Sequence, residues 1–263
     1  MKKLLYLLTA SVTLSFTSCL DSEEKIALKE DGSGTYSITM DMAKMMGMLS
    51  AFGGENKKPE KKDTVIYFKD FTDTSTTLTA DEKEILKNGK VGIHMDSDKG
   101  EMKIVMDANF KNVDQLVYLR NNFQEMIQKT HALDNLKDKK EITPGDEEMP
   151  SMTPKMGPPK ANTNPFKDYY EFTATANSLS YKVKDKEAAL KAMETNEELQ
   201  MMKKMAPMMG DMTFATTIVL PRPAIKIEGS KAKLSNDKKT VTVASTFKEI
   251  FSNLESLAFK VEY

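Results

Sequence analysis

The stretch MKIVMDANFKNVDQL, residues 102–116, contains the pattern from which most of the chain is built. Apolar residues occupy every second position of its first part: Met102, Ile104, Met106 and Ala108. This alternation is typical of a β-strand with one buried face. From Val113 onward the apolar residues recur at helical spacing, and Asn112 stands before them as a helix cap. The stretch therefore predicts a strand that leads almost directly into a helix.

A second stretch, TVTVASTFKEIFSNL at residues 240–254, has a similar pattern. The two align on the pairs Phe110-Lys111 and Phe247-Lys248. Either an ancient duplication or two α/β modules with the same patterning explains the likeness. We favour duplication slightly, and both explanations remain open at this point.

The remaining periodicity predicts hairpins and helices in alternation. Strand pairs are expected at 24–40, 91–108 and 170–183, single strands at 64–68, 212–220, 225–227, 232–234, 241–247 and 257–263, and helices at 42–52, 79–88, 112–127, 185–207 and 250–254. Successive hairpins favour antiparallel pairing. The predicted fold class is α+β: antiparallel β-sheet hairpins with helices packed on one face, in two similar halves if the duplication is real.

A break in the pattern divides the chain. Residues 134–166 are rich in proline and charge and contain few β-branched or aromatic residues. Such a segment buries too little apolar surface to offset the entropy lost on ordering, so we predict a flexible linker. The first α+β half then covers residues 26–133, and the second covers residues 167–263.

The N-terminus is typical of an export signal. Lys2 and Lys3 precede an apolar segment, residues 4–16, that is shorter than the roughly 20 residues needed to span a bilayer. Small residues follow, and then comes Cys19, the single cysteine of the chain. An exported protein with one cysteine at this junction suggests a dedicated role for the thiol.

The motif Phe16-Thr17-Ser18-Cys19 resembles a bacterial lipoprotein signal, although Phe16 stands where that family usually has leucine. The resemblance implies that residues 1–18 are removed, that Cys19 is acylated, and that residues 19–25 form a lipidated tether. Several acyl chains together give a durable anchor. It also implies a lipid anchor in the cell outer membrane, on its periplasmic or cell-surface face. The alternative is an ordinary secretory signal with a free thiol.

An acidic cluster follows the cysteine, at Asp21–Glu24. It resembles the surface-export tag of some Bacteroidota-type lipoproteins. A solvated acidic spacer explains the same residues, and we give the two interpretations equal weight.

Composition excludes some classes of function. The chain has 38 basic and 39 acidic side chains, which is not the basic excess of a nucleic-acid-binding protein. No Gly-x-Ser-x-Gly motif or phosphate-binding glycine loop is present, and we expect no cofactor. Of the two histidines, His94 has Asp96 and Asp98 as sequence neighbours; a solvent-facing hairpin residue is favoured over a carboxylate–imidazole site. His131 is predicted at the end of a helix, where a cation suits the helix dipole.

Methionine is abundant, with 20 residues. The densest cluster contains Met201, Met202, Met205, Met208 and Met209. Their helical spacing favours ordinary core packing. Methionine also lines adaptable binding surfaces, so the cluster is a candidate partner-binding site. Thioethers suit Cu(I) as well, but no histidine or cysteine lies nearby, and we expect no metal site.

Together these features predict a membrane-anchored lipoprotein of the cell envelope. Its ectodomain is expected to have a non-enzymatic binding or structural role, with a protein or lipid partner and no nucleic-acid partner. The alternatives are an envelope hydrolase that uses carboxylate residues, and copper binding through methionine.

Overall fold

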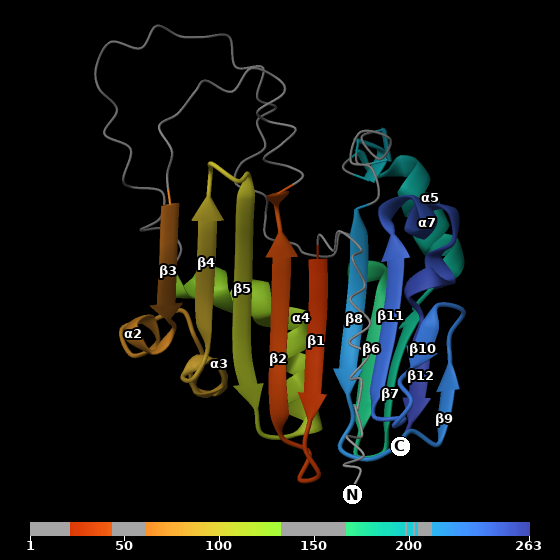
Figure 1. Cartoon of the computed structure of the whole chain (residues 1–263), viewed down its shortest axis with the longest axis horizontal. Coiled ribbons are helices and arrows are strands. Elements are labelled where there is room, and N and C mark those ends of the chain that lie inside the picture. Colours follow the sequence, from red (N-terminus) through yellow and green to blue (C-terminus); the bar gives the residue numbers. More distant parts are fainter. Residues whose placement is uncertain (1–21, 44–60, 133–166, 198, 202, 205–211) are drawn as a thin grey trace, which may run out of the picture.

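The computed structural model describes residues 22–43, 61–132, 167–197, 199–201, 203–204 and 212–263. These residues form two β-sheets with helices beside them (Figure 1). The predicted α+β class is confirmed. The predicted linker at 134–166 and most of the predicted helix at 42–52 lie outside the described residues.

The first half supplies five strands and three helices to the described part of the chain. They are β1 (Ser22–Leu28), β2 (Gly34–Asp41), β3 (Lys61–Tyr67), α2 (Lys69–Thr72), α3 (Ala80–Leu86), β4 (Lys90–Asp96), β5 (Glu101–Phe110) and α4 (Val113–Thr130). Both hairpins predicted here are present. Strand β1 begins at Ser22, inside the range 19–25 that was expected to be a tether. Asn112, the predicted cap, and Thr79, at the start of the helix predicted at 79–88, both accept the backbone N–H three residues later.

The second half contributes the remaining elements. They are η2 (Lys167–Tyr169), β6 (Tyr170–Thr175), β7 (Ser178–Val183), α5 (Lys186–Thr195), β8 (Thr213–Val219), β9 (Lys226–Glu228), β10 (Ala232–Leu234), β11 (Thr240–Thr246), α7 (Phe247–Ser252), η3 (Leu254–Leu257) and β12 (Phe259–Glu262). Asp185, the first residue of the helix predicted at 185–207, caps α5. The helix ends at Thr195, well before Pro207, because Asn196 leaves the helical conformation. The side chain of Asn196 then accepts the N–H of Leu199 and starts a second helical segment.

Eight strands form one sheet in the order β10-β11-β8-β1-β2-β5-β4-β3. Strands from both halves meet in it, because β1 pairs with β8. This pairing is parallel, with Glu24 opposite Thr216, whereas the other strand pairs are antiparallel. The pattern of successive hairpins predicted antiparallel pairing alone, and the β1–β8 pair is the one departure among the described strand pairs.

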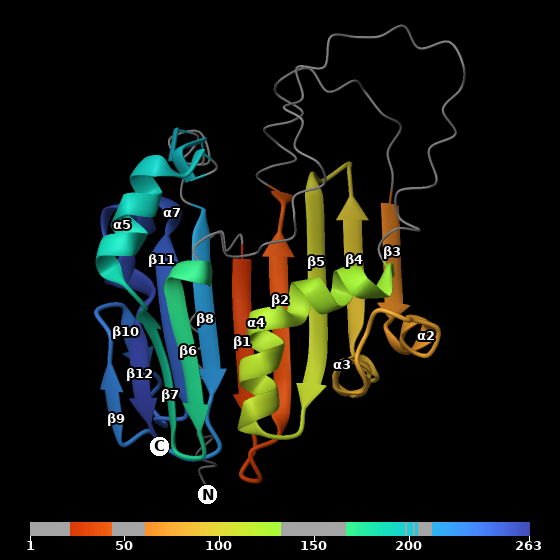
Figure 2. The ribbon, with the colours of Figure 1, turned by 180° about the vertical axis from the view of Figure 1, so that it is seen from behind.

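A smaller sheet has the order β6-β7-β12-β9. Figure 2 shows that this sheet and α4 lie on the same face of the large sheet, the small sheet over β8 and β11 and α4 over β1, β2 and β5. The core lies between these layers. Phe123 of α4 packs edge-on against Tyr36 and Phe68, with ring centroids 5.5 and 6.3 Å apart. Helices alone were expected to cover the sheet, but the small sheet covers it at β8 and β11 (Figure 2).

The two similar stretches occupy different positions relative to their helices. Phe110 is the last residue of β5, and its helix is capped two residues later by Asn112. Phe247 is the first residue of α7, and its cap, Thr246, precedes it. Both phenylalanines are buried. The likeness of the stretches therefore reflects a shared burial pattern, and the duplication remains a hypothesis.

A candidate site around the Glu24–Arg120 ion pair

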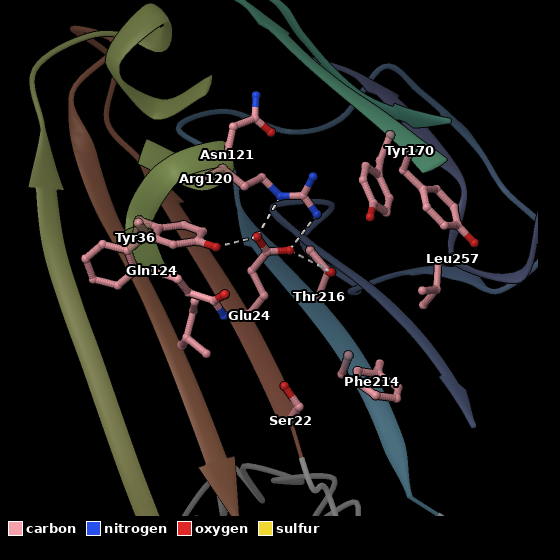
Figure 3. Close-up of a pocket in the computed structure, with 14 residues that line it drawn as sticks. Ser22, Glu24, Tyr36, Arg120, Asn121, Gln124, Tyr170, Phe214, Thr216 and Leu257 are labelled. Atoms are coloured by element: carbon pink, nitrogen blue, oxygen red, sulfur yellow. Dashed lines mark hydrogen bonds and ion pairs between the residues drawn. The ribbon is translucent and has the colours of Figure 1, made fainter. Parts of the chain in front are cut away.

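A buried ion pair joins the layers of the fold. Arg120 of α4 donates from Nε to one carboxylate oxygen of Glu24 at 2.6 Å and from Nη2 to the other at 2.8 Å. The Tyr36 hydroxyl donates to the first oxygen at 2.8 Å, and the Thr216 hydroxyl donates to the second at 3.1 Å (Figure 3). The side chains of Arg120 and Glu24 are 9% and 16% exposed. Four donors from β2, β8 and α4 thus converge on one carboxylate of β1.

Aromatic rings complete the surroundings of the guanidinium. Its carbon lies 4.0 Å from the ring centroid of Tyr181 and 4.4 Å from that of Phe172, both in the small sheet. Tyr170 stacks on Tyr181 with centroids 4.6 Å apart and donates its hydroxyl hydrogen to the backbone oxygen of Leu254. Cation–π contacts of this kind are most favourable when the cation is desolvated. Arg120 therefore contacts the large sheet through its ion pair with Glu24. It contacts the small sheet through the face of its guanidinium, which packs on the rings of Phe172 and Tyr181.

The environment fixes the charges of the pair. Burial alone raises the pKa of Glu24, but the Arg120 charge and the hydrogen bonds from Arg120, Tyr36 and Thr216 outweigh burial and lower it. Burial and the Glu24 charge raise the pKa of Tyr36 well above its ordinary value. For Arg120, burial alone lowers the pKa, and the Glu24 charge more than reverses this. Glu24 is thus held ionised and Tyr36 neutral, which is the state that the hydrogen bonds require.

A cavity of about 70 Å³ adjoins the ion pair. Its polar lining includes Ser22, Asn121 and Gln124 as well as Glu24, and its apolar lining includes Phe214 and Leu257 (Figure 3). Pockets that hold drug-sized ligands measure roughly 300–1,000 Å³. This one has room for a few water molecules or one very small molecule. Glu24 is the single carboxylate of the lining, and Arg120 neutralises it.

This pair was not predicted from the sequence. Glu24 was expected both at the start of the hairpin at residues 24–40 and at the end of the acidic cluster, which was interpreted as a spacer or an export tag. The structure corrects the spacer interpretation for the end of the cluster: Glu23 and Glu24 belong to β1, and Glu23 accepts a hydrogen bond from Thr217 at 3.0 Å. The sequence nevertheless contained an indication of this ion pair. Glu24 shares a strand face with Ile26, and Arg120 lies four residues after Leu116 on the apolar side of its helix. A charge on each buried face indicates a pair.

Of the five methionines in the predicted partner-binding site, the structure describes the side chain of Met201 only. Met201 is helical and 43% exposed, whereas Met202, Met205, Met208 and Met209 lie outside the described side chains, as does Cys19. Elsewhere methionine serves the core: Met106, Met126 and Met193 are buried. Among the described residues, no group of three or more His, Cys, Asp or Glu side chains is arranged to hold a metal ion.

His94 has different carboxylate neighbours from those expected. Its Nδ1 lies 2.7 Å from Asp63 of β3 and its Nε2 lies 3.4 Å from Glu101 of β5, while Asp96 is turned toward Lys61 and Lys99. The His94 side chain is 47% exposed. The expected solvent-facing position is confirmed, and the pair Asp96 and Asp98 is not the one that contacts the ring.

The titration of His94 tests these contacts. The hydrogen bond to Asp63, and then that to Glu101, raise the pKa of His94 above its ordinary value of 6.5. A raised pKa means that the stabilising contribution is present below pH 6.5 and is lost as the pH rises through the folded-state pKa. We expect an NMR titration to give a pKa above 6.5, and the Asp63→Asn variant to give a lower one. An unchanged pKa in that variant would show that the contact is absent in solution.

Comparison of the chain with protein-family models, with curated proteins and with solved structures gives no match. In the described part of the chain, no helix is both long and apolar enough to cross a membrane.

Proposed function

We propose that this protein is a lipid-anchored lipoprotein of the cell outer membrane. Its exported α+β ectodomain has a non-enzymatic binding or structural role, with a lipid or protein partner at the envelope. The supporting features are the basic start, the short apolar segment and the small residues before Cys19. The bacterial lipoprotein signal that these residues resemble implies acylation of Cys19 after removal of residues 1–18.

One observation carries the proposal: the position of Cys19 between the apolar segment and the folded domain. It is the single cysteine of the chain, and β1 begins three residues after it, at Ser22. A single cysteine cannot form a disulfide within the chain, and this one stands at the expected junction between a removable signal and a mature domain.

The Glu24–Arg120 ion pair supports a structural, non-enzymatic role for the ectodomain. Glu24 accepts four hydrogen bonds and is neutralised by Arg120, so the pair is suited to holding layers together rather than to moving protons. The hydrolase alternative requires two carboxylates near one substrate bond, and the cavity supplies Glu24 alone. The copper alternative rests on Met201 and on residues outside the description. Both stay hypotheses without a described site.

The experiment is fractionation of cells that express the full chain. Cys19→Ala is expected to move the protein from the membrane fraction to the soluble fraction, and to abolish incorporation of an alkyne-tagged fatty acid. Thr17→Ala, which keeps a small residue before Cys19, is the matched control and should remain with the membranes. The proposal is wrong if the Cys19→Ala protein still sediments with membranes after an alkaline carbonate wash.

A further inference from the structure

We infer that the end of the large sheet at which β1 begins faces the membrane, and that the helical residues 199–201, 203 and 204 lie against the bilayer surface. This inference rests on the proposed acylation of Cys19 and adds an orientation to it. The occupant of this surface is the bilayer that holds the acyl chains.

The reach of the tether limits the orientation. Three residue steps separate Cys19 from Ser22. At no more than about 3.5 Å for each residue, they span about 10 Å. Strand β1 is an interior strand, paired with β2 on one side and with β8 on the other, so Ser22 is fixed relative to the body of the domain. The beginning of β1 therefore lies within about 10 Å of the acylated residue.

Strand pairing shows which other segments share this end. Ser22 lies opposite Met40 of β2 and Phe214 of β8, and the β4–β5 turn and the start of β3 lie at the same end, at Asp96 and Lys61. Figure 1 shows α5, α7 and the helical segment after α5 at this end as well. The β1–β2 turn and the C-terminal end of β12 lie at the other end (Figure 1).

The helical segment after α5 is held firmly at this end. Leu199 is 3% exposed and packs in the core, and its N–H is capped by Asn196. The Gln200 amide donates to the backbone oxygens of Met193 and Glu194, both at 2.9 Å, which fixes the turn between the two helical segments. These contacts tie the backbone at Leu199 and Gln200 to α5 and to the core.

The exposed side chains of this segment suit a lipid surface. Met201 is 43% exposed, and Lys203 and Lys204 are exposed beside it. An apolar side chain next to lysines is the pattern of interfacial helices, because the apolar group enters the acyl boundary while the cations reach anionic headgroups. Lys61 and Lys99 add cations at the same end, with side chains 67% and 61% exposed, although both also contact Asp96.

Single-tryptophan probes test this orientation, because the chain contains no tryptophan. The acylated full-length protein is purified from membranes as the Met201→Trp and Ile225→Trp variants. Each is reconstituted into vesicles of phosphatidylethanolamine and phosphatidylglycerol, with and without a phospholipid brominated near the top of its acyl chains. Ile225 is 83% exposed and its N–H bonds to Glu262 at the far end of β12, so it serves as the matched control.

We expect bromine to remove about half of the emission of the Met201→Trp variant, since interfacial side chains enter the acyl boundary by roughly 5–10 Å. The emission of the Ile225→Trp variant should not change. If the protein floats with the vesicles but the Ile225→Trp variant is the quenched one, or neither is quenched, the orientation is wrong and the anchor stands. If the protein does not float with the vesicles, the anchor itself is wrong and the orientation falls with it.

Discussion

Arg120→Met is expected to lower the free energy of unfolding by about 3–5 kcal/mol, the usual cost of removing one partner from a buried ion pair. Glu24 would keep the hydrogen bonds from Tyr36 and Thr216 but lose its neutralising charge and two donors, in a position where its side chain is 16% exposed. The contacts of the guanidinium with Phe172 and Tyr181 would be lost as well. The loss is measured by urea unfolding followed by circular dichroism.

Two further variants separate this cause from general damage. Lys111→Met breaks the surface pair with Glu84, whose side chains are 68% and 44% exposed, and should cost less than about 1 kcal/mol. Combining Arg120→Met with Glu24→Leu removes both charges and should recover most of the loss, because no unpaired charge stays buried. A loss below about 1 kcal/mol for Arg120→Met alone would show that the pair does not bind the layers together.

Gly34→Ala is expected to cost about 3 kcal/mol, at the upper end of the range for overpacked sites. A Cβ at this position would lie 2.0 Å from the backbone oxygen of Ala27 and 2.4 Å from Cζ of Phe110. The first of these atoms belongs to β1, so the β1–β2 pairing must open to admit the methyl group. Urea unfolding measures the effect.

Gly92→Ala is the matched control within the same sheet. The nearest atom to its added Cβ is the oxygen of Val105, 3.9 Å away. Alanine is favoured over glycine in a strand interior, so this variant should be unchanged or more stable by up to about 1 kcal/mol. Equal losses in the two variants would contradict the close approach at Gly34.

Much of the local structure could be predicted because it depends on near neighbours. Alternation located the β1–β2 and β4–β5 hairpins, and the spacing between Thr79 and Glu82 is that of a capping box, which the structure contains. The C-terminal strand was likewise expected, and β12 occupies Phe259–Glu262. In each case the signal lies within a few residues of the feature.

The arrangement of these elements could not be predicted in the same way. The parallel β1–β8 pair and the separate β6-β7-β12-β9 sheet join residues that are far apart in the chain, and alternation does not say which strands pair. Asn196 looked like an ordinary position within a long helix, but its short polar side chain competes with the helical backbone and caps a new segment. The Glu24–Arg120 pair depends on the local burial pattern of each residue and also on the long-range arrangement of β1 and α4. Because the arrangement could not be predicted, the pair was missed.

Strand β1 also imposes an order of events on folding. Glu24 and Thr216 are separated by 192 positions, so the neighbour on one side of β1 is synthesised late. Contacts this remote close slowly, because a long loop must lose its freedom before they form. Until then the edge of β1 stays unpaired and is open to other strands. A chain truncated before β8 would carry that open edge permanently, which makes aggregation the expected fate of incomplete molecules.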